Sequence, residues 1–188
     1  ISAVKNFSAW DRYPFLIKND RELPLEGYIY PDTYFLNPIE FQPEELISKA
    51  LNNFRNKTVG LNITADQLTM ASIIENEVFG SKDRAIVSGI LWKRLENNWP
   101  IGADATLLYI TTDRHISAAD LAIDSPYNTR KNGGLPPGPI CNPSVESIEA
   151  ALNPKESPYW FYLTTLDTGE VIYAKTNEEH NDNRAKYL

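Results

Sequence analysis

The stretch from Leu61 to Phe79, LNITADQLTMASIIENEVF, constrains the fold most, because it reads as one uninterrupted helix. Thr64 and Gln67 have the spacing of a capping box, in which each side chain satisfies a free backbone N–H at the helix start. Gly80 then provides a natural stop. The apolar residues recur at three- and four-residue steps, the period of a helix face that packs on a core. These residues are Leu68, Ala71, Ile74 and Val78.

Glu75 falls inside this apolar arc, four residues after Ala71 and four before Phe79. The residues expected on the opposite, polar side are Thr69, Ser72 and Asn76. A carboxylate among apolar neighbours is costly to ionise, so we expect a raised pKa and a proton that Glu75 can donate. A general acid in glycosidic bond cleavage needs this property.

Two other interpretations of this helix stay open. Most glutamates beside an apolar stripe are boundary residues that reach water or pair with a base, and Glu75 suits that role too. Glu77 is a second candidate for the acid, although its wheel position between Met70 and Ile73 favours Glu75 on burial.

The composition limits the classes of function. The 188 residues are 42% hydrophobic and 23% charged, typical of a soluble globular protein of one ordinary domain. A net charge of −7 argues against nucleic acid or anionic lipid as a partner. Cys141 is the one cysteine, so no internal disulfide forms, and neither His115 nor His180 has metal-ligand spacing to it. We therefore expect no metal and no cofactor.

Further helices and a hairpin are expected along the chain. Apolar periodicity and capping residues predict helices at Pro43 to Phe54, Asp83 to Asn97, Asp104 to Tyr109, Ser117 to Asp120 and Val145 to Leu152. Residues 159–165 and 170–174 flank Asp167-Thr168-Gly169, which indicates a β-hairpin. A closing helix is expected over 176–188, where a lone His180 suits capping or packing.

Two irregular segments complete this interpretation. Alternating tyrosines between Leu23 and Leu36 favour an extended edge strand that packs aromatic rings on the core, rather than one that stacks them on a sugar. The glycine- and proline-rich segment from Ser125 to Pro143 favours an ordered loop, either functional or a structural cover. The fold class we expect is α+β: a helical layer with a small antiparallel sheet made of the 23–36 segment and the C-terminal hairpin.

Several separated blocks resemble, in order, the YceG-like (MltG) family of endolytic murein transglycosylases. They are LEGYIYPDTY at 25–34, MASIIENEV at 70–78, ILWKRL at 90–95, DATLLY at 104–109, SPYNT at 125–129, GLPPGPICNPSVESIEAALNP at 134–154 and EHN at 179–181. The hairpin predicted over 159–165 and 170–174 also resembles the family's. The resemblance covers nearly all of the chain from Leu25 onward.

The resemblance implies a catalytic residue and a domain division. The first glutamate of the second block is the family's catalytic residue, here Glu75. Residues 1–24 would be a linker or the end of a preceding LysM-like domain, and 25–188 the YceG-like catalytic domain. Two residues depart from the family pattern: Asn76 stands where a lysine is common, and Ala105 where a proline is common.

The resemblance also implies a place in the cell. Full-length members resemble single-pass membrane proteins whose catalytic domain lies on the extracytoplasmic face. The chain starts at Ile1 and has no apolar run of membrane length, so we expect a soluble fragment without its anchor. The implied partners are peptidoglycan glycan strands and, for the whole protein, penicillin-binding synthases; nucleic acid is not expected.

The implied reaction cuts the β-1,4 bond between N-acetylmuramic acid and N-acetylglucosamine and leaves a 1,6-anhydro end, with Glu75 as both acid and base. Glu77 and Asp104 would assist it or only hold hydrogen bonds, while Tyr127, Asn128 and Thr129 would form the wall of the substrate groove. Two alternatives remain. A hydrolytic muramidase would need Glu77 or Asp104 to activate water. A non-catalytic peptidoglycan-binding module would need the loops but not Glu75.

Overall fold

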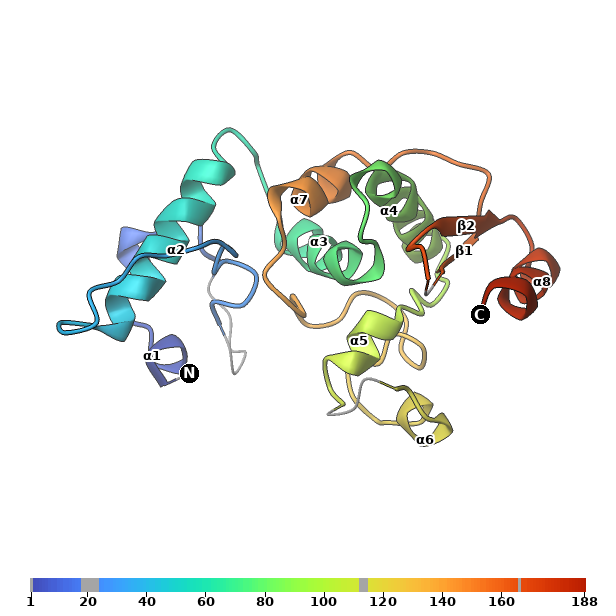
Figure 1. Cartoon of the computed structure of the whole chain (residues 1–188), viewed down its shortest axis with the longest axis horizontal. Coiled ribbons are helices and arrows are strands. Elements are labelled where there is room, and N and C mark those ends of the chain that lie inside the picture. Colours follow the sequence, from blue (N-terminus) through green and yellow to red (C-terminus); the bar gives the residue numbers. More distant parts are fainter. Residues whose placement is uncertain (1, 18–23, 112–114, 166) are drawn as a thin grey trace.

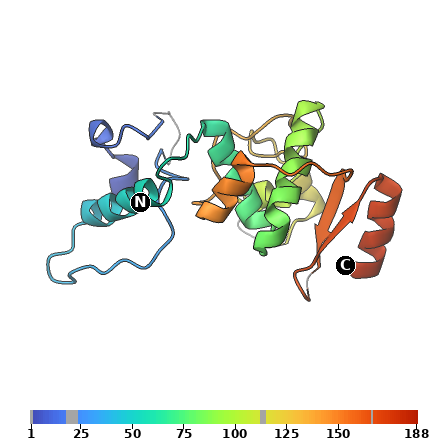
Figure 2. The same ribbon diagram turned by 90° about the horizontal axis from the view of Figure 1, so that it is seen from above.

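The computed structural model describes residues 2–17, 24–111, 115–165 and 167–188. Its centre is helix α3 (Ala65–Glu77), with α4 (Ser81–Glu96) and α7 (Val145–Leu152) packed against it (Figure 1). The other elements are α1 (Ser2–Lys5), the 3-10 helix η1 (Trp10–Arg12), α2 (Pro43–Lys57), α5 (Asp104–Leu108), α6 (Ala118–Leu121), β1 (Phe161–Thr164), β2 (Val171–Ala174) and α8 (Asn177–Tyr187). Helices α1 and α2 lie at one end of the long axis, and the hairpin with α8 lies at the other (Figures 1 and 2).

The α3 capping box is confirmed. The Gln67 N–H donates to Thr64 Oγ1 over 3.2 Å, and the Thr64 N–H donates to Gln67 Oε1 over 3.0 Å. The helix then ends at Glu77, and Val78 is already extended.

The expected polar side of α3 is wrong for Thr69 and Ser72, which are buried. The loop over residues 125–143 packs on this side of α3. The Ile140 N–H of the loop donates to Ser72 Oγ over 3.0 Å. The Ser72 hydroxyl in turn donates to the Thr69 carbonyl over 2.7 Å. Small hydroxyl side chains can therefore lie inside this core, because each buried polar atom has a partner.

The remaining predicted helices are confirmed with shifted ends. Helix α2 extends three residues beyond Phe54 to Lys57, and α4 begins at Ser81 instead of Asp83. Helix α7 has the predicted bounds, and α8 follows a Thr176 cap. His180 in α8 stacks on Phe161 with ring centroids 5.3 Å apart, the expected packing role.

The C-terminal hairpin is confirmed as an antiparallel pair, with Tyr162 opposite Tyr173 and Leu163 opposite Ile172. The α+β class is confirmed too, since the described chain is mostly helical with this small sheet. Within the described ranges the sheet has two strands, so the predicted third strand from 23–36 is wrong.

The 24–28 stretch forms turns because its backbone is bonded by a side chain instead of a neighbouring strand. Asn142 Oδ1 accepts the N–H groups of Gly27 and Ile29 over 2.8 and 3.0 Å. Gly27 has φ +95°, and a Cβ there would lie 2.6 Å from Pro139 Cγ. Only glycine fits such a close approach in this backbone conformation.

Residues 2–17 contact the rest of the chain through aromatic rings. Phe15 stacks on Phe54 of α2 at 5.8 Å, and Tyr28 meets the same ring edge-on at 5.3 Å. Across the part of the chain that the structure describes, no helix has the length and apolar character to cross a membrane.

Candidate active site

Glu75 lies in the last turn of α3, with its carboxylate at the N-terminus of α7. Glu75 Oε2 accepts the Ser144 N–H over 2.9 Å and the Ser144 hydroxyl over 2.6 Å. Ser144 is also the N-cap of α7, where its Oγ accepts the Ser147 N–H over 3.4 Å. The carboxylate therefore occupies the positive end of a helix, which favours negative charge.

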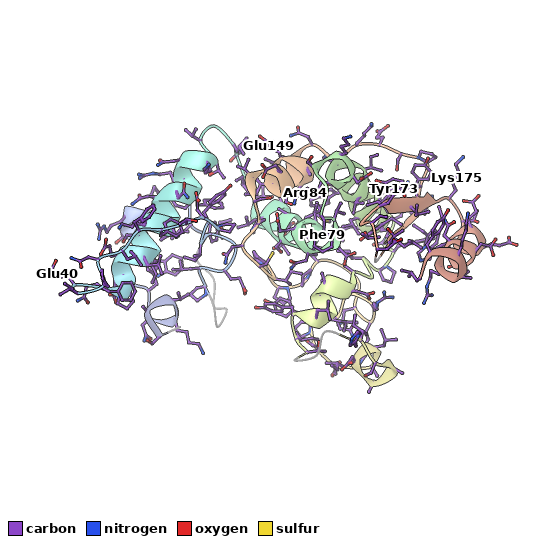
Figure 3. All side chains as sticks on the ribbon, in the orientation of Figure 1. Glu40, Phe79, Arg84, Glu149, Tyr173 and Lys175 are labelled. Atoms are coloured by element: carbon purple, nitrogen blue, oxygen red, sulfur yellow. The ribbon has the colours of Figure 1, made fainter. Side chains whose placement is uncertain are left out.

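Arg84 of α4, labelled in Figure 3, completes the surroundings of this carboxylate. Its Nη2 lies 3.5 Å from Glu75 Oε1, and its Nη1 donates to Ser144 Oγ over 3.1 Å. Its Nε donates to the Val78 carbonyl over 3.4 Å, just after α3 ends. Three helices thus hold one carboxylate, whose side chain is 26% exposed.

The predicted raised pKa of Glu75 is wrong in direction. Burial does raise the pKa, but the hydrogen bonds from Ser144 and the charge of Arg84 outweigh it and leave the pKa below its ordinary value. The apolar neighbours of Glu75 on its own helix favour a raised pKa, but the donors that lower the pKa lie on α7 and α4.

Glu77 has the raised pKa instead, with burial as the main cause. Glu77 Oε1 accepts the Ala105 N–H over 3.1 Å, and Oε2 accepts the Tyr162 hydroxyl over 2.9 Å. These two bonds offset burial only in part. The expectation that burial acts more strongly on Glu75 than on Glu77 is therefore wrong.

This raised pKa predicts a pH dependence of stability that depends on Glu77. The folded state holds its proton more tightly than the unfolded state, so the contribution is favourable below pH 4.5, the ordinary value, and is lost as pH rises through the folded pKa. We expect Glu77→Gln to lessen this loss. Urea unfolding of both proteins from pH 4 to pH 8 tests it, and parallel stability profiles would contradict it.

Glu75 and Glu77 point to different neighbours, since two residues on a helix are separated by about 200° of rotation. Glu77 and Asp104 instead line one groove of about 460 Å³ between the end of α3, α5 and β1. Asp104 is half-exposed and pairs with Arg130, whose Nε and Nη2 lie 2.7 and 2.5 Å from Asp104 Oδ1. The predicted site residues therefore form two groups on either side of α3.

The segment from Ser125 to Pro143 is confirmed as a loop without helix or strand, and Asn128 and Thr129 lie inside it. Their exposed fractions are 0% and 1%. The Asn128 amide donates to the Leu121 and Ile123 carbonyls over 3.1 and 2.9 Å. The Thr129 hydroxyl accepts the Ala103 N–H over 3.2 Å. Both side chains connect the loop to its surroundings, which leaves them little surface for a direct ligand contact.

Tyr127 differs from these two, because it is only partly buried. Its ring lies 4.8 Å from the ring of Tyr109, whose hydroxyl donates to Glu26 Oε2 over 2.6 Å. This makes Tyr127 the one member of the predicted wall with a ring that a ligand can approach.

Sequence reasoning missed Ser144, Arg84 and Tyr162 as partners of the two glutamates. Ser144 had a usable signal, because a serine directly before a predicted helix is a typical N-cap with a free hydroxyl. No sequence signal connects Arg84 or Tyr162 to α3. Their positions depend on how α4 and the hairpin pack.

Among the residues described, no group of three or more His, Cys, Asp or Glu side chains is arranged to hold a metal ion. Burial raises the pKa of Cys141 to about 12, so its thiol stays protonated near neutral pH. That thiol donates to the Ser72 carbonyl over 3.3 Å. The chemistry available at Glu75 is therefore that of a carboxylate with neutral and cationic donors around it.

Residues 3–186 match the sequence model of the YceG-like family. The chain belongs to the YceG-like family. The family resemblance read from the separated sequence blocks is thereby confirmed. The crystal structure of a yceG-like protein from Listeria monocytogenes has the same fold, with a TM-score of 0.84 and 34% identity. It covers 96% of this YceG-like chain, which spans 65% of the Listeria chain.

Two curated relatives carry the name endolytic murein transglycosylase. The Bacillus subtilis protein is 38% identical over 176 residues, which cover 88% of this chain and 48% of the relative. The Streptococcus pneumoniae protein is 33% identical over 178 residues, which cover 87% of this chain and 32% of the relative. The chain thus spans about half or a third of the length of these relatives.

Proposed function

We propose that this chain is the catalytic part of an endolytic murein transglycosylase. It would cut glycan strands internally at the bond between N-acetylmuramic acid and N-acetylglucosamine. The name of the relatives supports the substrate and the reaction. The observation that carries the assignment to a residue is the Glu75 carboxylate, held by Ser144 and Arg84 at the junction of three helices and still partly exposed.

One carboxylate is enough for the proposed reaction. Protonated Glu75 donates its proton to the glycosidic oxygen, and the C1–O bond to the leaving N-acetylglucosamine breaks. The Glu75 carboxylate then accepts the proton of the C6 hydroxyl of the same muramic acid, whose O6 bonds to C1. The products are a free 4-hydroxyl and a 1,6-anhydro end. The two proton transfers balance, and no water is consumed.

Before substrate binds, the surroundings of Glu75 favour its carboxylate form, which is the base that the second proton transfer needs. Ser144 and Arg84 lower the pKa, so the free protein holds a carboxylate at neutral pH. A glycan strand that covers the side chain removes its remaining water, and this favours the protonated form that the first step needs. Glu75 is therefore the acid once the strand is bound. Its hydrogen bonds then stabilise the carboxylate that acts as the base in the second transfer.

The placement of the other carboxylates favours a transglycosylase over a hydrolase. A hydrolase usually needs a second carboxylate to activate water. Glu77 is held by Ala105 and Tyr162, and Asp104 is paired with Arg130. Both line the groove at the end of α3 and are not among the groups that contact the Glu75 carboxylate. In this proposal Glu77 and Asp104 organise that groove, Asn128 and Thr129 position the loop, and Tyr127 is exposed to the strand.

We place the catalytic domain at residues 25–188 and assign 1–24 to a linker or to the end of a LysM-like domain. The substrate implies that the domain works on the extracytoplasmic face of a bacterial membrane, through an anchor in the whole protein. Penicillin-binding synthases, which make the glycan strands, are the partners that this location suggests.

Digestion of purified glycan strands tests the proposal. We expect long strands to disappear early, which marks internal cuts, and the fragments to be one water lighter than hydrolysis products by mass spectrometry. Fragments with free reducing ends would assign the chain to the hydrolytic muramidases. Binding without cleavage would instead support a non-catalytic module.

A further inference from the structure

Phe79 is a large apolar side chain at the surface directly after α3. Its exposed fraction is 82%, while the preceding Val78 is fully buried. Arg84 holds the backbone here, because its Nε donates to the Val78 carbonyl over 3.4 Å; both Arg84 and Phe79 are labelled in Figure 3. Within the described ranges no other aromatic ring pairs with Phe79. The ring is therefore presented to solvent at a fixed point of the backbone.

Phe79 forms part of the lining of the groove that contains Glu77 and Asp104. The same lining includes a second exposed apolar side chain, Leu108. The polar groups along the same groove include the side chains of Asn76 and Thr164. An aromatic face next to several hydrogen-bonding groups is the usual composition of a small-ligand site.

The charges of this groove select the kind of ligand. Its described lining contains two side-chain carboxyl groups, of which Asp104 is paired with Arg130, and no lysine, arginine or histidine. Carboxyl oxygens accept hydrogen bonds from hydroxyl and amide groups, and they repel anions. A neutral N-acetylated sugar offers hydroxyl and amide N–H donors at its edges. Its pyranose ring also has an apolar C–H face that matches an exposed aromatic ring.

The groove is close to Glu75 along the chain. Asn76, which follows Glu75 directly, lines the groove, and Phe79 follows the last residue of α3 by two positions. A strand bound at Glu75 can therefore continue over the end of α3 into the groove.

From these features we infer that Phe79 stacks on the pyranose ring of an N-acetylglucosamine, the uncharged sugar of the glycan strand, and forms a sugar subsite next to Glu75. This inference rests on the proposed function and names a contact within it. The groove carboxyl groups then accept hydrogen bonds from the edges of the same sugar, while Phe79 covers its apolar face.

Binding in a Glu75→Gln background tests the subsite without cleavage. The probe is a purified, peptide-free oligosaccharide of alternating N-acetylglucosamine and N-acetylmuramic acid, measured by calorimetry. We expect Phe79→Ala to weaken binding by about two- to tenfold, the range of single aromatic contacts, and Phe79→Tyr to retain it. Phe35→Ala is the matched control, because Phe35 is 87% exposed, precedes α2 in the chain and does not line the groove.

Two further measurements distinguish a lost sugar contact from a loss of folding or of the catalytic step. A ring that is 82% exposed contributes little to folding, so Phe79→Ala should keep the parent's thermal unfolding. With Glu75 intact, Phe79→Ala should raise KM more than it lowers kcat. Unchanged binding by Phe79→Ala, or no binding by the Glu75→Gln parent, would overturn the subsite. If binding depends on Phe79 but the unmodified chain cuts nothing, the proposed function fails and the subsite stands.

Discussion

Glu75→Gln is expected to lower the rate of glycan cleavage by about 10³-fold or more. The glutamine side chain has nearly the same shape, and its Oε1 can still accept the Ser144 N–H. It can neither donate a proton to the glycosidic oxygen nor accept one from the C6 hydroxyl. Proton transfer by one positioned group contributes about 10²–10⁴-fold, and here one residue performs both transfers. Initial rates of strand cleavage by the two proteins give the ratio.

Glu149→Gln is the matched control for this substitution. Glu149 is an exposed carboxylate on α7, the helix whose N-cap holds Glu75 (Figure 3). We expect its loss to leave the cleavage rate unchanged. Cleavage by Glu75→Gln within tenfold of the parent, with normal folding, would contradict the catalytic role of Glu75.

Gly89→Ala is expected to destabilise the fold by about 2–3 kcal/mol, as overpacked sites do. Alanine normally stabilises the interior of a helix relative to glycine by about 1 kcal/mol, and Gly89 lies in the interior of α4. A Cβ at this position would lie 2.0 Å from the carbonyl oxygen of Lys155 and 2.8 Å from its carbonyl carbon. The Lys155 N–H donates to the Ala85 carbonyl over 2.8 Å, so this backbone is held on α4 and cannot easily move away.

Urea unfolding measures this change, and Gly133→Ala provides the control. A Cβ at Gly133 would have no heavy atom within 4 Å, and its backbone is not in the left-handed region. We expect its effect to stay within about 0.5 kcal/mol. A Gly89→Ala protein as stable as the parent would show that the segment at Lys155 does not pack this closely on α4.

Local patterns predicted the elements of this fold well. The capping box of Thr64 and Gln67 and the hairpin turn at Asp167 to Gly169 depend on residues a few positions apart, so the sequence displays them directly. The central helix and α7 were predicted for the same reason. The strand predicted at 23–36 failed because the side chain of Asn142, more than 100 residues away, bonds the backbone there.

The candidate site could be predicted only in part. The position of Glu75 on a helix followed from periodicity, and its proposed catalytic role from the resemblance of the family blocks. The direction of its pKa shift did not follow, because the donors come from Ser144 on α7 and Arg84 on α4. Asn128 and Thr129 illustrate the same limit, since their burial depends on partners in α5 and the α6 region that no local pattern reveals.

The most direct test of the central claim is the isotopic composition of the new ends formed in water enriched in ¹⁸O. The unmodified chain and Glu75→Gln would be incubated side by side with purified glycan strands, and the fragments weighed by mass spectrometry. If Glu75 transfers a proton and O6 closes onto C1, the unmodified chain releases 1,6-anhydro fragments without ¹⁸O, and Glu75→Gln releases almost none. Fragments from the unmodified chain that carry one ¹⁸O at a reducing end would contradict the transglycosylase account.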